Sequence, residues 1–152
     1  MVEHRFAWPK LSAISAVTPR GKLYFRVHKG AIKSKQVIAF LRHLLRHTRR
    51  PLVILWDGVG PHVSAQTRRF IEGQPRLQVH RLPPYCPELN PDEWFWANLK
   101  TRHLANHGAA NLAQLRRLIR LAVVRIRRRP KLIASFYRAC PLSQSTRQRR
   151  RQ

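Results

Sequence analysis

The hydrophobic positions in the first third of the chain predict a hairpin followed by a helix. Residues 11–17 and 23–28 are short segments rich in apolar and aromatic side chains, and residues 18–21 read Thr-Pro-Arg-Gly, a typical turn. From Ser34, which can cap a helix, apolar residues recur at helical spacing to about His47, while basic residues occupy the other face. The pattern therefore predicts two strands, a tight turn and an amphipathic helix.

Strands and helices are then expected to alternate. Residues 52–56 are an unbroken apolar run after Pro51, as in a strand that is buried on both faces of a parallel sheet. A short helix over residues 64–72 and a strand over residues 77–82 follow. This order indicates an α/β sheet with crossover helices.

The second half is predicted to be mostly helical. Prolines between residues 83 and 91 exclude regular structure until Asn90, which can cap a helix over residues 91–104. Asn111 can start a final helix with apolar residues on one face and most of its arginines off that face. Residues 143–152 are polar and Arg-rich, and we expect them to be disordered until they meet phosphate.

The net charge adds a polyanionic partner to this picture. The chain has 152 residues, enough for about one domain, and its hydrophobic fraction of 43% is that of a foldable sequence. Its 31 Lys and Arg against six Asp and Glu give a formal charge of +25. Because basic side chains that neutralise phosphates release counterions, nucleic acid is the expected partner and binding should weaken steeply with salt. A protein that merely coats nucleic acid fits the charge equally well.

Cysteine usage and hydropathy exclude several other classes of protein. Cys86 and Cys140 lie far apart and match no metal-ligand spacing, which argues against a zinc site and a disulfide scaffold. The first residues lack the apolar stretch of a signal peptide, and no segment approaches the ~18 apolar residues needed to cross a bilayer. We therefore expect a soluble intracellular protein with no membrane partner.

One candidate for chemistry is Asp57, which directly follows the apolar run 52–56. Sites in open α/β sheets form at the carboxyl ends of strands, and Gly58 allows the backbone to turn away there. The alternative is that the Asp-Gly pair only makes a turn.

A second candidate is Glu93, which stands with Glu88 and Asp92 in one short window. Its alternative role is structural, because a Glu at the third helical position can bond back to the amide of the cap, Asn90, and acids favour the positive end of a helix. Helical spacing leaves open which of the two adjacent acids points toward Asp57.

The segment Leu82–Lys100 reads Leu-Pro-Pro-Tyr-Cys-Pro-Glu-Leu-Asn-Pro-Asp-Glu-Trp-Phe-Trp-Ala-Asn-Leu-Lys. Together with the upstream Asp57, it resembles the catalytic domain of the DDE transposases of bacterial insertion sequences related to the mariner superfamily. In that family this block carries the third catalytic acid, which maps to Glu93, and the acid after the fourth strand maps to Asp57. The resemblance implies a catalytic domain over residues 1–137 and a basic tail over residues 138–152.

The resemblance implies an α/β, RNase H-like fold: a mixed sheet with flanking helices. In it, three carboxylates hold two Mg²⁺ ions about 4 Å apart, with Mn²⁺ as a substitute. Asp57 and Glu93 would then be both catalytic residues and metal ligands. His62 and His80 are candidate neighbours of the site, with a phosphate contact or a surface position as the alternative.

Trp94 and Trp96 are expected to anchor the core rather than to stack on bases, because the helix needs an apolar stripe.

The first catalytic Asp of the family lies on a strand upstream of the hairpin, and here Glu3 is the only acid before Asp57. We therefore expect this first strand to be missing, together with the helix-turn-helix region that recognises the ends of the element. This pattern is typical of the carboxyl-terminal part of a truncated, frameshifted or split transposase.

The expected function is DNA transposition, by Mg²⁺-dependent strand cleavage and strand transfer in the nucleoid of a bacterial cytoplasm. The expected partners are DNA and either an amino-terminal transposase fragment or a full-length transposase, and a homo-oligomer stays open. The alternative is a non-catalytic basic remnant that binds DNA or regulates a full-length transposase. A general RNA-binding protein would have no use for converging Asp57 and Glu93 carboxylates.

Overall fold

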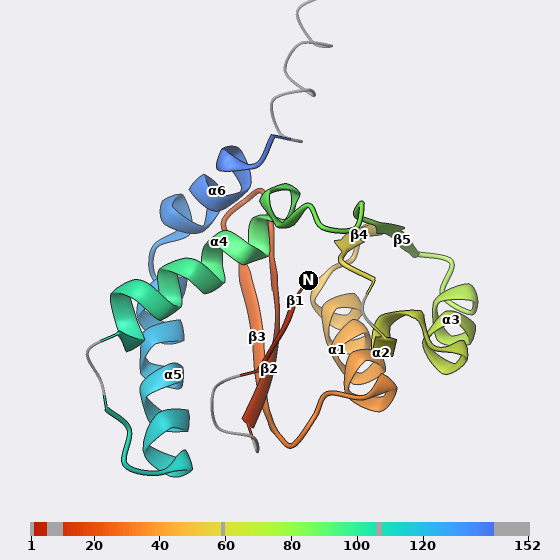
Figure 1. Ribbon diagram of the computed structural model, residues 1–152. Helices are drawn as coiled ribbons and strands as arrows, with labels where there is room; N and C mark the ends of the chain where they lie inside the picture. The colour runs from red at the N-terminus through yellow and green to blue at the C-terminus, as the bar shows by residue number, and fades with distance from the viewer. Residues whose placement is uncertain (1, 6–10, 59, 106–107, 142–152) are drawn as a thin grey trace, which may run out of the picture. The chain divides into compact units, whose positions relative to one another are not determined.

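The computed structural model describes residues 2–5, 11–58, 60–105 and 108–141, and the chain divides into two units (Figure 1). The first unit comprises Met1–Ile14 and Arg26–Tyr85, and the second comprises Ser15–Phe25 and Cys86–Gln152. The tail expected over residues 138–152 lies outside the described residues from residue 142 onward.

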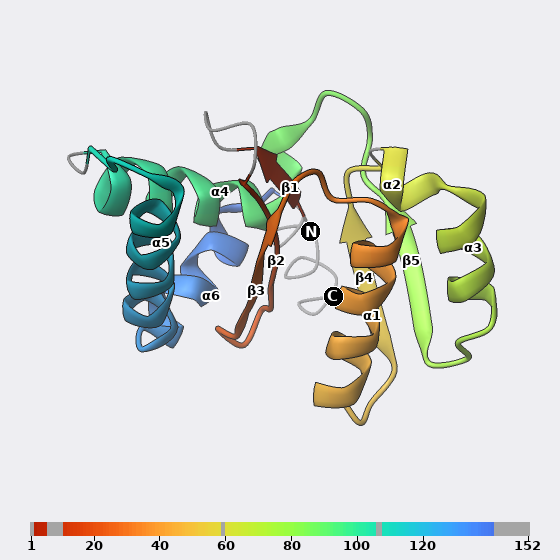
Figure 2. The ribbon, with the colours of Figure 1, turned by 90° about the horizontal axis from the view of Figure 1, so that it is seen from below.

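Strands and helices alternate in the first unit, as the sequence predicts (Figure 2). In chain order its elements are β1 (Val2–Arg5), the first part of β2 (Leu11–Val17), the last part of β3 (Leu23–Lys29), α1 (Ser34–His47), β4 (Leu52–Trp56), α2 (Gly60–Val63), α3 (Ala65–Glu72) and β5 (Leu77–Arg81). The β4 and β5 strands are parallel, with Leu52 beside Leu77 and Trp56 beside Arg81. Helices therefore connect two parallel strands, which confirms the predicted crossover.

The core of the first unit lies under the apolar face of α1. Its buried side chains are Val37, Phe40, Leu41, Leu44, Ile54, Trp56 and Leu77. The Arg76 guanidinium donates to the carbonyls of Leu45, Thr48 and Arg49 at 2.8–3.3 Å, which ties the end of α1 to the start of β5. One side chain thus satisfies carbonyls that the helix end leaves open.

Two details of this unit differ from the prediction. The β4 strand is not buried on both faces, because Val53 is 56% exposed. Ser34 does not cap α1: the cap is Lys33, whose N–H donates to the side chain of Gln36 at 3.1 Å. The Ser34 hydroxyl instead donates to that of Ser64 at 2.7 Å.

The hairpin is confirmed, and it has a neighbour that the sequence did not predict. The strand order is β1-β2-β3. Backbone bonds from the N–H of Thr18 to Lys22 and from the N–H of Gly21 to Thr18 close the turn. The first strand of the family's sheet was expected to be missing, yet a strand, β1, pairs with β2; it contains Glu3 and no Asp.

The second unit is mainly helical, and α4, α5 and α6 lie side by side in both ribbon views (Figures 1 and 2). It contains η1 (Pro87–Leu89), α4 (Pro91–Asn98), the π-helical segment η2 (Leu99–Leu104), α5 (Leu112–Arg127) and α6 (Pro130–Ala139). The helix predicted over residues 91–104 and the cap by Asn111, which accepts from the N–H of Gln114, are confirmed. The pattern did not predict α6.

The turn of the hairpin packs on the start of α6 in this unit. Gly21 has φ +83°, and a Cβ added to it would lie 2.2 Å from the carbonyl oxygen of Pro130. The Arg127 guanidinium donates from Nε to the carbonyl of Leu23 at 3.1 Å, and Phe25 packs edge-on against Phe95. The left-handed φ of Gly21 and its close approach to Pro130 explain why a glycine is needed in the turn.

Both cysteines are free thiols. No helix among the described residues is long and apolar enough to span a membrane.

Candidate active site

Asp57 directly follows β4, in a turn that Gly58 makes possible. Gly58 has φ +71°, a left-handed conformation that costs a residue with a side chain about 1–2 kcal/mol. A Cβ there would also lie 2.7 Å from Nε of Arg81, whose guanidinium donates to the Gly58 carbonyl at 3.3 Å. Because Arg81 is beside Trp56 in the parallel register, β5 fixes the turn that presents Asp57.

His62 holds the Asp57 carboxylate from inside the first unit. The two side chains are joined by Nδ1 and Oδ1 at 3.0 Å, and their exposed fractions are 0% for His62 and 30% for Asp57. An ionised carboxylate only accepts hydrogen bonds, so Nδ1 carries the shared proton. The His62 ring also stacks on Trp56, with centroids 4.6 Å apart and planes 7° apart. Its Nε2 is buried and has no partner in the described part of the chain.

A network of hydroxyl groups anchors the segment that contains His62. Ser64 caps α3 by accepting from the N–H of Thr67 at 3.2 Å. The Thr67 hydroxyl is buried and donates to the Pro61 carbonyl at 2.7 Å, and Ser34 donates to Ser64. Because each buried hydroxyl has a partner, the chain on both sides of His62 is held in one conformation.

Asp92 is a core residue of the second unit. It is 1% exposed, and its Oδ2 accepts from the hydroxyl of Ser15 at 2.6 Å. It shares a buried stripe with Phe95 and Trp96 of α4 and with Leu99, the first residue of η2. A hydrogen bond from a buried hydroxyl explains an acid here without any catalytic role.

Glu93 is half-buried in the first turn of the same helix. The cap, Asn90, accepts from the N–H of Asp92 through its side chain, while its own N–H donates to the Pro87 carbonyl at 2.9 Å. The amide that Glu93 was expected to cap therefore has a backbone partner. Capping of Asn90 is therefore a weaker explanation for Glu93. That Glu93 is a metal ligand stays a prediction.

The two candidate ligands belong to different units, Asp57 to the first and Glu93 to the second. Their convergence stays a prediction. Within the residues that the structure describes, no group of three or more His, Cys, Asp or Glu side chains is placed to hold a metal ion.

Exposure to solvent differs among three other residues for which the sequence made a prediction: His80, Trp94 and Trp96. His80 is exposed on β5, and among the described residues no hydrogen bond joins it to Asp57. Trp96 is fully buried, which confirms it as a core anchor, whereas Trp94 is 43% exposed and is not one. The prediction for the tryptophans was therefore right for one of the two.

Tyr85 was not singled out by the sequence analysis. It is the last residue of the first unit, its side chain is 100% exposed, and its φ of 59° is left-handed. Such backbone strain in a residue other than Gly costs about 1–3 kcal/mol and clusters at functional segments. The only signal in the sequence was the prolines on either side of Tyr85, which indicate a constrained loop but do not specify its conformation.

The donor set suits a hard divalent cation. Carboxylate oxygens are the ligands that Mg²⁺ prefers in proteins, and it binds through one or two carboxylates with water and substrate oxygens as the rest of its shell. Asp57 is partly exposed and held by a buried His, an arrangement common around metal ligands. The residues present therefore fit Mg²⁺ or Mn²⁺.

Comparison with known proteins agrees with this reading of the fold. Residues 2–116 match the family model of the DDE superfamily endonucleases. Among solved structures, the catalytic domain of the Mos1 mariner transposase is similar, with a TM-score of 0.59 and 15% identity over 88% of this chain and 78% of that one. No curated protein matches the sequence at a significant level. At this identity the structural likeness establishes the RNase H-like fold.

Proposed function

The chain belongs to the DDE superfamily endonucleases, and on that premise we propose that it acts in DNA transposition, by metal-dependent cleavage and transfer of DNA strands. The observation that carries this proposal is the pair at the end of β4, in which buried His62 holds the partly exposed Asp57. A carboxylate that only ended a strand would need no buried imidazole to orient it.

In this proposal Asp57 and Glu93 hold the metal ions, and His62 fixes the orientation of the Asp57 carboxylate by donating from Nδ1. When bound, such ions would supply Lewis-acid activation of the attacking oxygen and stabilisation of the leaving oxygen. Asp92 takes no part, because its carboxylate accepts from Ser15 within the core.

The third carboxylate of the family has no counterpart before Asp57 other than Glu3. We propose that a segment outside these 152 residues supplies it, from an amino-terminal transposase fragment or a full-length transposase. The chain by itself then binds DNA without cleaving it. Binding to DNA also implies association with the bacterial nucleoid.

A nicking assay tests the function directly. The purified chain is incubated with supercoiled plasmid and Mg²⁺ or Mn²⁺, alone and with a segment containing an Asp-bearing strand supplied in cis or in trans. We expect nicking only with the added segment, and no nicking when Asp57→Ala is introduced. Cleavage by the chain alone that Asp57→Ala abolishes would support the nuclease and refute the need for the segment.

A second candidate is a non-catalytic protein that binds DNA or regulates a full-length transposase. The net charge of +25 favours it, since charge alone is sufficient for such a role. Adding the chain to an active transposase in the nicking assay separates the two candidates, because a regulator lowers the nicking by that transposase and gives none itself with the added segment.

A further inference from the structure

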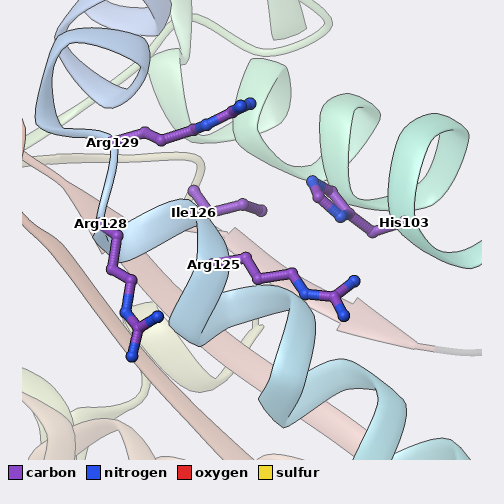
Figure 3. A pocket seen from close by; sticks show the side chains of 5 residues that line it. All are labelled: His103, Arg125, Ile126, Arg128 and Arg129. Carbon is purple, nitrogen blue, oxygen red and sulfur yellow. The ribbon is translucent and has the colours of Figure 1, made fainter.

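A cavity of about 390 Å³ lies in the second unit where η2 meets the end of α5 (Figure 3). It is lined by His103, Arg125, Ile126, Arg128 and Arg129. In Figure 3 His103 extends from its helix toward the end of α5, between Arg129 and Arg125, while the Arg128 side chain extends away from it. His103, Arg125 and Arg129 therefore face the same space.

No acid lines this cavity among the residues that the structure describes. Within the described part of the chain, no hydrogen bond or ion pair holds the side chains of Arg125, Arg128 or Arg129. Burial lowers the pKa of His103, and the guanidiniums of Arg125, Arg129 and Arg102 lower it further. Since guanidinium stays protonated in proteins, the cavity is an unneutralised positive site.

Rigid elements position this site. Arg127 stands between Ile126 and Arg128 in the sequence but is not among the residues that line the cavity. Its guanidinium donates to the Leu23 carbonyl and burial lowers its pKa, so its role is structural. Pro130 begins α6 directly after Arg129. Basic residues favour the carboxyl end of a helix, which can account for Arg125 in the last turn of α5 and for His103 in the last turn of η2. It does not account for Arg129, or for the fact that all three side chains line one cavity.

We propose that this cavity is a phosphate site for the DNA backbone, in which Arg125, Arg129 and His103 bind the oxygens of one phosphodiester. Guanidinium groups suit this ligand because their paired N–H groups match two phosphate oxygens. Such a contact positions DNA on the protein and reads no sequence. The inference rests on the proposed function for the identity of the polyanion as DNA.

A pair of double variants tests the site in the full chain. The first is Arg125→Gln with Arg129→Gln, and the matched control is Arg117→Gln with Arg120→Gln on exposed positions of the same helix outside the cavity. Each of the two double variants removes two positive charges. Binding to a DNA duplex of fixed length is measured by fluorescence anisotropy over a salt series.

We expect the cavity variant to lose about ten-fold in affinity more than the control, and its slope of log affinity against log salt to fall by about 1, as for one lost phosphate contact. Equal losses in both variants would overturn the site, because general charge would then explain them. A loss for single-stranded RNA with none for duplex DNA would also overturn it.

An NMR titration gives a readout that does not depend on DNA. On addition of inorganic phosphate, the ring signals of His103 should move at lower phosphate concentration than those of exposed His80. Identical responses of the two rings contradict the site. If the unmodified chain binds no duplex while His103 still responds to phosphate, the proposed function fails and the anion site stands.

Discussion

At the scale of single residues, the two neighbouring acids at the start of α4 have different environments. This difference predicts a structural role for Asp92 and a functional role for Glu93. Asp92 is buried and accepts from Ser15, while Glu93 is half-buried beside it. A buried acceptor stabilises the fold through its partner, whereas a partly exposed acid near a helix start adds little to stability.

Replacing each acid by Ala should therefore give different effects on the free energy of unfolding. Asp92→Ala leaves the buried Ser15 hydroxyl without its acceptor and should cost about 2–3 kcal/mol. Glu93→Ala should cost less than about 1 kcal/mol. Urea unfolding measures both, and a larger loss for Glu93→Ala would show that Glu93 is the structural acid.

His62 should act on the metal through Asp57. His62→Phe preserves a ring that can stack on Trp56 but removes the donor, and we expect it to weaken Mn²⁺ binding about 10- to 100-fold, the usual cost of losing a group that orients a ligand. His62→Asn loses the stacking but keeps an N–H near the position of Nδ1, so it should bind Mn²⁺ better than His62→Phe.

Electron paramagnetic resonance of free Mn²⁺ gives both dissociation constants. Unchanged binding by His62→Phe, with a loss in His62→Asn, would indicate that stacking and not the hydrogen bond matters. Equal losses in both variants would contradict the expected dominance of the hydrogen bond.

At the scale of elements, the hairpin and α6 depend on each other through Gly21. Its φ is +83°, and its Cα faces the Pro130 carbonyl so closely that no side chain fits. Gly30 offers a matched control, because its φ is +77° but nothing lies within 4 Å of the place for a Cβ.

Gly21→Ala should lower the free energy of unfolding by about 3 kcal/mol or more, from backbone strain and overpacking together. Gly30→Ala should lose only the strain, about 1–2 kcal/mol. Urea unfolding of the two variants makes the comparison, and similar losses would mean that the contact with Pro130 is not maintained in solution.

Elements with strong local signals were predictable from the sequence. The periodicity of α1, the cap at Asn111 and the turn before Gly21 are encoded by neighbouring residues, and all three are confirmed. The α6 helix was missed because the three arginines and the proline at residues 127–130 indicate only the end of the previous helix. The exposure of Val53 was missed because an unbroken apolar run does not show which of its faces is covered.

The candidate site was predictable as residue types but not as contacts. The motif pointed to Asp57 and Glu93, and His62 was named only as a neighbour. The pairing of Ser15 with Asp92 depends on how segments 77 residues apart pack, which spacing along the chain does not encode. The bond between His62 and Asp57 is local, but it depends on the conformation of the turn after β4, which the residue types do not specify.

At the scale of the whole molecule, each of the two units contains one candidate metal ligand. The central claim of this account, that Asp57 and Glu93 share a site, therefore requires both units. If basic residues alone accounted for the function, DNA could bind to either unit by itself.

A crystal structure of the chain in Mn²⁺, with anomalous diffraction to locate the metal, tests that claim most directly. We expect a peak with oxygens of both Asp57 and Glu93 at about 2.1–2.3 Å from one ion, or from two ions about 4 Å apart. Carboxylates separated by more than about 10 Å with no shared peak, or Asp92 in place of Glu93 as the ligand, would contradict it.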